Sequence, residues 1–165
     1  MAIPGIEILK MKAISNLISI EHQVQPAGIE LTLRDVEEFI DPGYIDLTNE
    51  KRKISKCRKI EFDSEGKVFL SKGAYKVRFN EVVHVPENMI AIGIPRSSLL
   101  RSGVMVFSAL WDPGYRGRSE SLLVVFNPNG VYLERNARLM QLIFVRMESK
   151  PHKLYNGIYK NENIK

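Results

Sequence analysis

An acidic side chain and an aromatic ring share one tight turn in the segment from Trp111 to Gly117. Pro113 fixes φ and Gly114 adopts a positive φ at little cost, so the turn should hold Asp112 and Tyr115 in a defined relation. A carboxylate fixed in this way can take a proton from water, which makes the turn a candidate catalytic site. The plain alternative is a β-turn in which the aspartate only caps the backbone.

A second segment, from Pro95 to Gly103, follows an expected strand and holds two guanidinium groups and three hydroxyls. Guanidinium forks and serine hydroxyls bind phosphate oxygens, and backbone N–H groups at the start of a short helix add to an anion site. The segment is therefore a candidate polyphosphate site. A serine-capped surface helix with solvated arginines fits the same residues. The side chains concerned are Arg96, Ser97, Ser98, Arg101 and Ser102.

Other chemistries lack their motifs. The three histidines, His22, His84 and His152, are scattered singly, so a zinc site of the deaminase type is not expected. No glycine-rich loop ends in Gly-Lys-Ser or Gly-Lys-Thr, which excludes a nucleoside triphosphatase of that type. The single cysteine, Cys57, has basic neighbours that would favour its thiolate if it were exposed. No histidine-based motif accompanies it, so we expect an incidental thiol.

Length and composition indicate one soluble domain. A chain of 165 residues with 44% hydrophobic and 26% charged residues is typical of a globular protein. We expect a single β-rich domain over residues 1–150 and a C-terminal arm or lid over 151–165. The apolar runs are too short to cross a membrane, and the start lacks a basic region followed by an apolar core, which predicts a cytoplasmic protein without a membrane partner.

The net charge of +5 favours an anionic partner but does not identify it. The densest basic run, from Lys51 to Lys59, contains no aromatic residue on which a base could stack. We therefore interpret it as a solvated loop or edge strand and expect no nucleic-acid partner.

Short β-rich segments separated by turn residues dominate the chain after a helix expected over Ile6 to Ile20. They predict an all-β sandwich, barrel or jelly roll. Two nearly continuous apolar runs, Leu122 to Phe126 and Leu139 to Val145, favour burial on both faces and hence self-association. The expected strands are Ile29–Leu33, Lys59–Phe62, Lys67–Leu70, Ala74–Phe79, Val82–Val85, Met89–Ile94, Val104–Ala109, Ser121–Asn127, Gly130–Leu133 and Leu139–Met147.

Four short motifs occur in order along nearly the whole chain: Gln25–Leu31, Pro95–Leu99, Asp112–Gly117 and Arg138–Phe144. Together they resemble the dUTPase and dCTP deaminase superfamily, and most of all its archaeal-type dUTPases, which are built on the deaminase-like frame. The resemblance implies a homotrimer of all-β, distorted jelly-roll or β-clip subunits with a short N-terminal helix. It also implies active sites between subunits and Mg²⁺ carried in on the triphosphate.

The chain lacks the glutamate that the resemblance associates with deamination. In the deaminase branch, a glutamate in the strand after the turn moves protons during attack on the cytosine ring. Its place falls on Val124 when counted back from Asn127, and on Leu122 when counted forward from Asp112. Neither can move a proton. The only nearby acid, Glu120, would require a shifted register.

The resemblance to dUTPases implies a role for each candidate. Asp112 would activate water for attack on the α-phosphorus of dUTP, and Tyr115 would pack on the deoxyribose. The segment from Val106 to Leu110, with Ala109, would read uracil through its backbone. Glu30, where the family usually has Asp, would lie near metal-bound waters, so no direct metal ligand is expected. Phosphates would be held by Arg96, Ser97, Ser98, Arg101, Gln141, Tyr155 and Lys160.

Two alternatives remain open at this point. One is a dCTP deaminase, which would be bifunctional if it also hydrolysed dUTP. The other is a non-catalytic nucleotide-binding regulator that has kept the fold.

Overall fold

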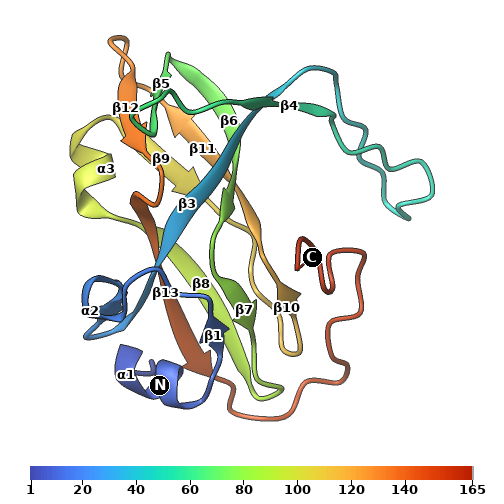
Figure 1. Cartoon of the computed structure of the whole chain (residues 1–165). Coiled ribbons are helices and arrows are strands. Elements are labelled where there is room, and N and C mark those ends of the chain that lie inside the picture. Colours follow the sequence, from blue (N-terminus) through green and yellow to red (C-terminus); the bar gives the residue numbers. More distant parts are fainter. Residues whose placement is uncertain (165) are drawn as a thin grey trace.

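The computed structural model describes residues 1–164 and shows a protein built mainly from β-strands (Figure 1). No helix in this range is long and apolar enough to cross a membrane. The elements are α1 (Gly5–Lys10), β1 (Ile14–Ser15), α2 (Ile20–Gln23), β2 (Val24–Gln25), β3 (Gly28–Phe39), β4 (Cys57–Ile60), β5 (Lys67–Leu70), β6 (Gly73–Phe79), β7 (Val82–His84), β8 (Met89–Pro95), α3 (Ser97–Arg101), β9 (Val104–Phe107), β10 (Arg116–Gly117), β11 (Glu120–Val125), β12 (Val131–Glu134) and β13 (Arg138–Arg146).

Six strands form one antiparallel path in the order β8, β13, β3, β6, β11 and β9. The two ends of this path, β8 and β9, also contact each other, so the sheet curls into a nearly closed barrel. Its interior is filled by fully buried apolar side chains, among them Leu31, Val77, Leu123 and Phe144. Burying each such side chain stabilises the fold by about 1.5–3 kcal/mol. The barrel is therefore the rigid frame on which the loops are held.

All ten strands expected from the sequence are present, with ends that differ by a few residues. β5 has the expected bounds, whereas β3 continues to Phe39 instead of ending at Leu33. An irregularity between Leu33 and Asp35 separates two halves of β3. The first half pairs with β13 and the second with β6 and β4, so one long strand joins both sides of the barrel.

The helix expected over Ile6 to Ile20 is wrong in its length. α1 ends at Lys10, and the backbone takes a left-handed conformation at Lys12 and Asn16, with φ of 56° and 62°. A continuous helix cannot contain such residues. Between them Ile14 and Ser15 pair with β7, so a sheet contact with a distant part of the chain overrides the local helical pattern.

The two apolar runs have one buried and one uncovered face within the chain. In β11, Leu123 and Val125 are buried, whereas Leu122 is 38% exposed and Val124 is half-buried. β13 alternates in the same way through Leu142, Ile143 and Phe144. The apolar residues on the uncovered faces of these two strands are therefore not needed for packing inside one chain.

The segment between β3 and β4 projects from the body as a long arm (Figure 1). Tyr44 and Lys53 pair across it, and Lys53 and the N–H of Lys56 both contact the Asp41 carboxylate, which lowers the pKa of Asp41. The basic run lies on this exposed arm and on β4, an edge strand paired only with β3, as expected. Burial raises the pKa of Cys57, so its basic neighbours do not make it a reactive thiolate.

Glu81 is a fully buried carboxylate in the turn between β6 and β7. It accepts hydrogen bonds from the backbone N–H and hydroxyl of Thr32, at 2.9 and 2.6 Å, and from the amide of Gln23 at 2.6 Å. Burial raises the pKa of Glu81, and these hydrogen bonds oppose the shift. Because the folded pKa lies above the unfolded one, the contribution of this group to stability is complete at acidic pH and is lost as the pH rises through the folded pKa.

We therefore expect the stability of the parent, relative to a Glu81→Gln variant, to fall as the pH rises. The variant cannot titrate at this position, so it lacks this part of the pH dependence. Urea unfolding of both proteins between about pH 4 and pH 8 measures the difference. Glu87→Gln, at an exposed position, is the control for loss of a surface carboxyl. If the free energy of unfolding of the parent increased relative to that of the variant as the pH rises, this account of Glu81 would be contradicted.

Candidate active site

The turn at Asp112 is anchored on one side by β8 of the barrel and on the other by Val85, which follows β7. Trp111 and Ala91 exchange two backbone hydrogen bonds, and Gly114 donates its N–H to the carbonyl of Val85 at 3.0 Å. The N–H of Tyr115 donates to the Asp112 carbonyl at 3.0 Å, and Gly114 has a φ of 82°. The expected tight turn is confirmed. Trp111 and Tyr115 are buried while Asp112 is exposed, so the rings anchor the turn and the carboxylate stays accessible.

Asp112 lines a cavity of about 720 Å³ that lies where β9 ends and β11 begins. Its wall includes a backbone stretch, Ser108 to Leu110, that follows the end of β9. Within the described residues, the N–H and C=O groups of Ala109 make no backbone hydrogen bond, so they are free to pair with a ligand. The lining residues are Phe39, Ile54, Lys76, Phe107, Ser108, Ala109, Leu110, Trp111, Asp112, Tyr115, Ser119, Glu120, Ser121, Leu122, Tyr155, Tyr159 and Glu162.

The C-terminal segment closes one side of this cavity. The N–H of Tyr155 donates to the carbonyl of Pro113 at 2.8 Å, and Glu162 forms a parallel bridge with Gly117 of β10. The ring of Tyr155 meets that of Tyr115 edge to face, with centroids 5.7 Å apart. Residues 155–162 thus pack as an irregular segment beside the Asp112 turn and β10.

Tyr115 and Glu162 form a buried hydrogen-bonded pair in the cavity wall. The phenol of Tyr115 donates to Glu162 Oε1 at 2.7 Å. Burial, followed by this bond, raises the pKa of Tyr115 well above its usual range, so the phenol remains a neutral donor. Burial also raises the pKa of Glu162, and the bond from Tyr115 opposes that shift. This hydrogen bond fixes the orientation of the Tyr115 ring, which lines the cavity.

A second, smaller cavity of about 300 Å³ lies where β8 runs into α3 beside β13. Glu30 is buried at its base and joins two arginines: Arg96 Nε donates to Oε1 at 2.6 Å, and Arg138 Nη1 donates to Oε2 at 2.9 Å. Ser97 and Gln141 also line it. Glu30 holds Arg96 through Nε, and Arg96 Nη1 donates to the carbonyl of Arg138 at 3.5 Å, so Nη2 remains available for an anion.

The structure separates the sequence candidates into two groups. Asp112, Ala109, Tyr115 and Tyr155 line the first cavity, whereas Arg96, Ser97, Gln141 and Glu30 line the second. The two cavities share no lining residue. Three further candidates line neither cavity and are exposed: Ser98, Arg101 and Lys160.

Sequence reasoning assigned no role to Glu162 and Lys76, which line the first cavity, or to Arg138, which binds Glu30 of the second. Arg138 had a usable signal, because Glu30 in an apolar strand requires a cationic partner and Arg138 begins one of the four motifs. Glu162 and Lys76 reach the cavity only through the fold, since β6 and the C-terminal segment are far from the turn in sequence.

Residues 7–147 match the family described as dCTP deaminase-like. The chain belongs to that family. The matched range includes the Asp112 turn and the whole of the second cavity, whereas Tyr155, Tyr159 and Glu162 of the first cavity lie beyond it. The C-terminal wall of the first cavity thus lies outside the part of the chain that matches the family.

Relatives from archaea cover most of the chain. A protein of Methanosarcina acetivorans, named a probable deoxyuridine 5′-triphosphate nucleotidohydrolase, is 47% identical over 92% of this chain and 89% of its own length. One of Methanocaldococcus jannaschii, named a deoxyuridine 5′-triphosphate nucleotidohydrolase, is 41% identical over 85% of this chain and 88% of its own. The dCTP deaminase of Agrobacterium tumefaciens shares the fold, with a TM-score of 0.61 and 18% identity over 87% of this chain and 47% of that one.

Proposed function

We propose that the protein hydrolyses dUTP to dUMP and pyrophosphate, with Asp112 activating the water that attacks the α-phosphorus. The observation that carries this proposal is the accessible Asp112 carboxylate, held on an anchored turn in a cavity that also contains Tyr115 and free backbone groups. The archaeal relatives named for dUTP hydrolysis cover 92% and 85% of the chain at 47% and 41% identity. A carboxylate in this setting deprotonates water within hydrogen-bond reach of a phosphorus centre.

The free backbone groups at Ala109 favour uracil over cytosine. The imide edge of uracil presents both a donor and acceptors, so one N–H and one C=O of the loop can pair with it. At cytosine, one backbone group would face a like group and stay unpaired, which costs about 1–3 kcal/mol. Base selection then needs no charged side chain.

We assign the phosphates to the second cavity, where Arg96, Ser97 and Gln141 converge beside Glu30. In a single chain these groups do not line the Asp112 cavity. We propose that a homotrimer of distorted jelly-roll or β-clip subunits joins the two halves, each site taking Asp112 from one subunit and Arg96 from another. The exposed apolar residues on the outer faces of β8, β9 and β11 support such contacts; they are Ile92, Ile94, Phe107 and Leu122.

Mg²⁺ fits this site as an ion carried by the substrate. Among the described residues, no three histidine, cysteine, aspartate or glutamate side chains cluster as a direct ligand set. The phosphate cavity supplies one carboxylate, Glu30, whose two oxygens already accept from Arg96 and Arg138. Glu30 therefore fits an outer role, as acceptor for a metal-bound water, and the ion itself would offset charge on the departing pyrophosphate.

Glu120 is the one observation that favours the deaminase alternative, because it lines the same cavity as Asp112. It lies on the same face of β11 as Leu122 and Val124, the two places expected for the proton-carrying glutamate. Its carboxylate is engaged by Arg78 at 2.7 Å and by Lys76 at 3.2 Å. These two ion pairs tie the Glu120 carboxylate to β6, so we assign Glu120 to fixing the cavity wall.

The function is tested by supplying the purified protein with dUTP, dCTP and dTTP in turn, with Mg²⁺ present. We expect rapid release of pyrophosphate from dUTP and little from the other two. Ammonia release from dCTP would instead favour the deaminase, and nucleotide binding without any turnover would favour the non-catalytic regulator.

Tyr115 is expected to exclude ribonucleotides. Its ring is fixed between Glu162 and Tyr155, so it presents a rigid wall to the sugar. Tyr115→Ala should lower the preference for dUTP over UTP, measured as a ratio of kcat/KM, by about tenfold or more. Tyr115→Phe keeps the ring and should retain most of that preference. An unchanged ratio in the alanine variant would show that another group reads the sugar.

A further inference from the structure

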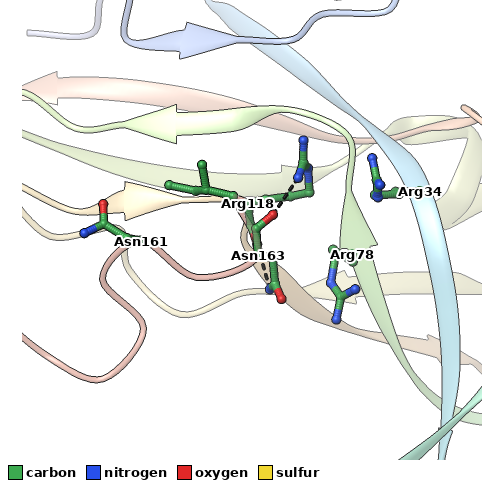
Figure 2. A pocket seen from close by; sticks show the side chains of 6 residues that line it. Arg34, Arg78, Arg118, Asn161 and Asn163 are labelled. Carbon is green, nitrogen blue, oxygen red and sulfur yellow. Dashed lines mark hydrogen bonds between the residues drawn. The ribbon is translucent and has the colours of Figure 1, made fainter.

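A third cavity, of about 360 Å³, shares no lining residue with the first one. Figure 2 shows the residues that line it. Three arginines from separate parts of the chain line it: Arg34 of β3, Arg78 of β6 and Arg118 from the link between β10 and β11. Its remaining wall comes from the C-terminal segment, through Asn161, Asn163 and Ile164. None of these lining residues is acidic.

Arg118 carries a buried positive charge with no carboxylate partner within residues 1–164. It is 7% exposed, and its guanidinium donates to the backbone carbonyl of Asn80. It also donates to the backbone carbonyl of Asn163 (Figure 2). Burial and the positive charges of Arg34 and Arg78 lower the pKa of Arg118. Arginine nevertheless remains protonated, so the charge must be compensated from elsewhere.

The surrounding ion pairs do not supply that compensation. Four cations share three carboxylates next to the cavity, and Glu61 reaches only Lys59, from the solvent side. Glu81, a buried acid whose charge acts on Arg118, already accepts three hydrogen bonds from Thr32 and Gln23. The four cations are Arg34, Lys59, Lys76 and Arg78, and the carboxylates are Asp35, Glu37 and Glu120.

We propose that this cavity is a binding site for a phosphate-class anion, such as inorganic pyrophosphate or the phosphate of a nucleotide. Guanidinium groups bind phosphate oxygens through paired N–H donors, and an anion between Arg34 and Arg118 would relieve their mutual repulsion. The Nδ2 group of Asn161 adds a neutral donor, whereas Nδ2 of Asn163 is engaged by the Arg118 carbonyl and Glu120. The volume exceeds that of a single phosphate, which leaves room for a second phosphoryl group.

The same anion would hold the C-terminal segment closed over the Asp112 cavity. Asn163 Nδ2 donates to the carbonyl of Arg118 at 3.1 Å, and the N–H of Arg118 donates to the carbonyl of Glu162 at 2.9 Å. Glu162 in turn accepts the phenol of Tyr115 in the first cavity. One short stretch thus walls both cavities, so a ligand that binds only the closed arrangement stabilises it. An anion site of this kind links anion concentration to closure of the proposed active site.

The proposal is tested by binding of inorganic pyrophosphate to the full-length protein, with no nucleotide present. An Arg96→Ala background removes the phosphate cavity as a competing site. In that background we expect pyrophosphate to bind, and Arg34→Gln to weaken it by about tenfold through loss of one charge-assisted contact. Arg34 is half-exposed, so this variant should fold even if Arg118→Gln does not. Arg146→Gln removes the same charge at an exposed position and should leave the affinity unchanged.

Closure is read separately from tryptic cleavage after Lys160, which lies on the exposed side of the C-terminal segment. Pyrophosphate should slow this cleavage several-fold in the Arg96→Ala protein and have no such effect once Arg34→Gln is added. Parallel titration with dUMP distinguishes a free inorganic anion from the phosphate of a nucleotide. Binding of neither probe, or an affinity that depends on Arg96 but not on Arg34, would overturn the proposal. Because no hydrolysis is measured, failure here leaves the proposed function untouched.

Discussion

Replacing Asp112 with asparagine is expected to lower kcat for dUTP hydrolysis by about 10²–10⁴-fold, the usual contribution of a positioned general base. Asparagine has nearly the same shape and can still accept a hydrogen bond, so the turn closed by Asp112 and Tyr115 should persist. What it cannot do is take a proton from water. KM should change little, because the carboxylate acts on the attacking water and not on the bound nucleotide.

The chain contains a matched control for this variant. Asp41 begins the other Asp-Pro-Gly-Tyr tetrapeptide and lies on the projecting arm, where it pairs with Lys53. Asp41→Asn should leave kcat within about twofold of the parent, because no step of the proposed chemistry uses it. Steady-state kinetics and urea unfolding of both variants separate loss of chemistry from loss of folding. Hydrolysis by Asp112→Asn at the parental rate would remove the proposed base.

Mixing two inactive variants is expected to restore activity. Arg96→Ala should be strongly impaired, because it removes a guanidinium that stabilises charge on the departing phosphates. If each site takes Asp112 from one subunit and Arg96 from another, random reassembly with Asp112→Asn gives about one intact site in four. Activity of the mixture should therefore reach about a quarter of the parental value, far above either variant alone.

The control for this mixing experiment carries both changes. Reassembly of Asp112→Asn with the double variant Asp112→Asn, Arg96→Ala contains no intact acid and should remain inactive. A mixture of the two single variants that never exceeds their mean would mean that Asp112 and Arg96 act within one chain. That result would contradict the shared site while leaving dUTP hydrolysis itself possible.

Local patterns predicted the strands and the turn because they depend on neighbouring residues. Strands such as β5 are short runs bounded by turn residues, and the Asp112 turn is set by Pro113 and Gly114. The N-terminal helix is present but shorter than expected, for the opposite reason. Its apolar spacing is compatible with a helix, yet pairing of Ile14 with Val83 of β7 decides the outcome, and that contact is remote in sequence.

The same limit applies to the site. The sequence did not show that Asp112 and Arg96 line separate cavities, because that relation depends on how distant strands pack. It also did not distinguish Glu162, which lines the first cavity, from the exposed Lys160, because that difference arises where the C-terminal segment meets β10. The pairing of Glu30 with Arg96 and Arg138 joins three motifs that the sequence shows merely in order. Residue types alone indicated the chemistry of the side chains. Only the fold shows which of these side chains share a cavity.

The central claim is tested most directly by incubating the protein with equal amounts of dUTP and dCTP in water enriched in ¹⁸O and analysing the products by mass spectrometry. Attack of activated water on the α-phosphorus predicts dUMP that carries one ¹⁸O, unlabelled pyrophosphate and unconsumed dCTP. Label in the pyrophosphate would place the attack on another phosphorus, and conversion of dCTP to a uracil nucleotide would reveal the deaminase that Leu122 and Val124 argue against.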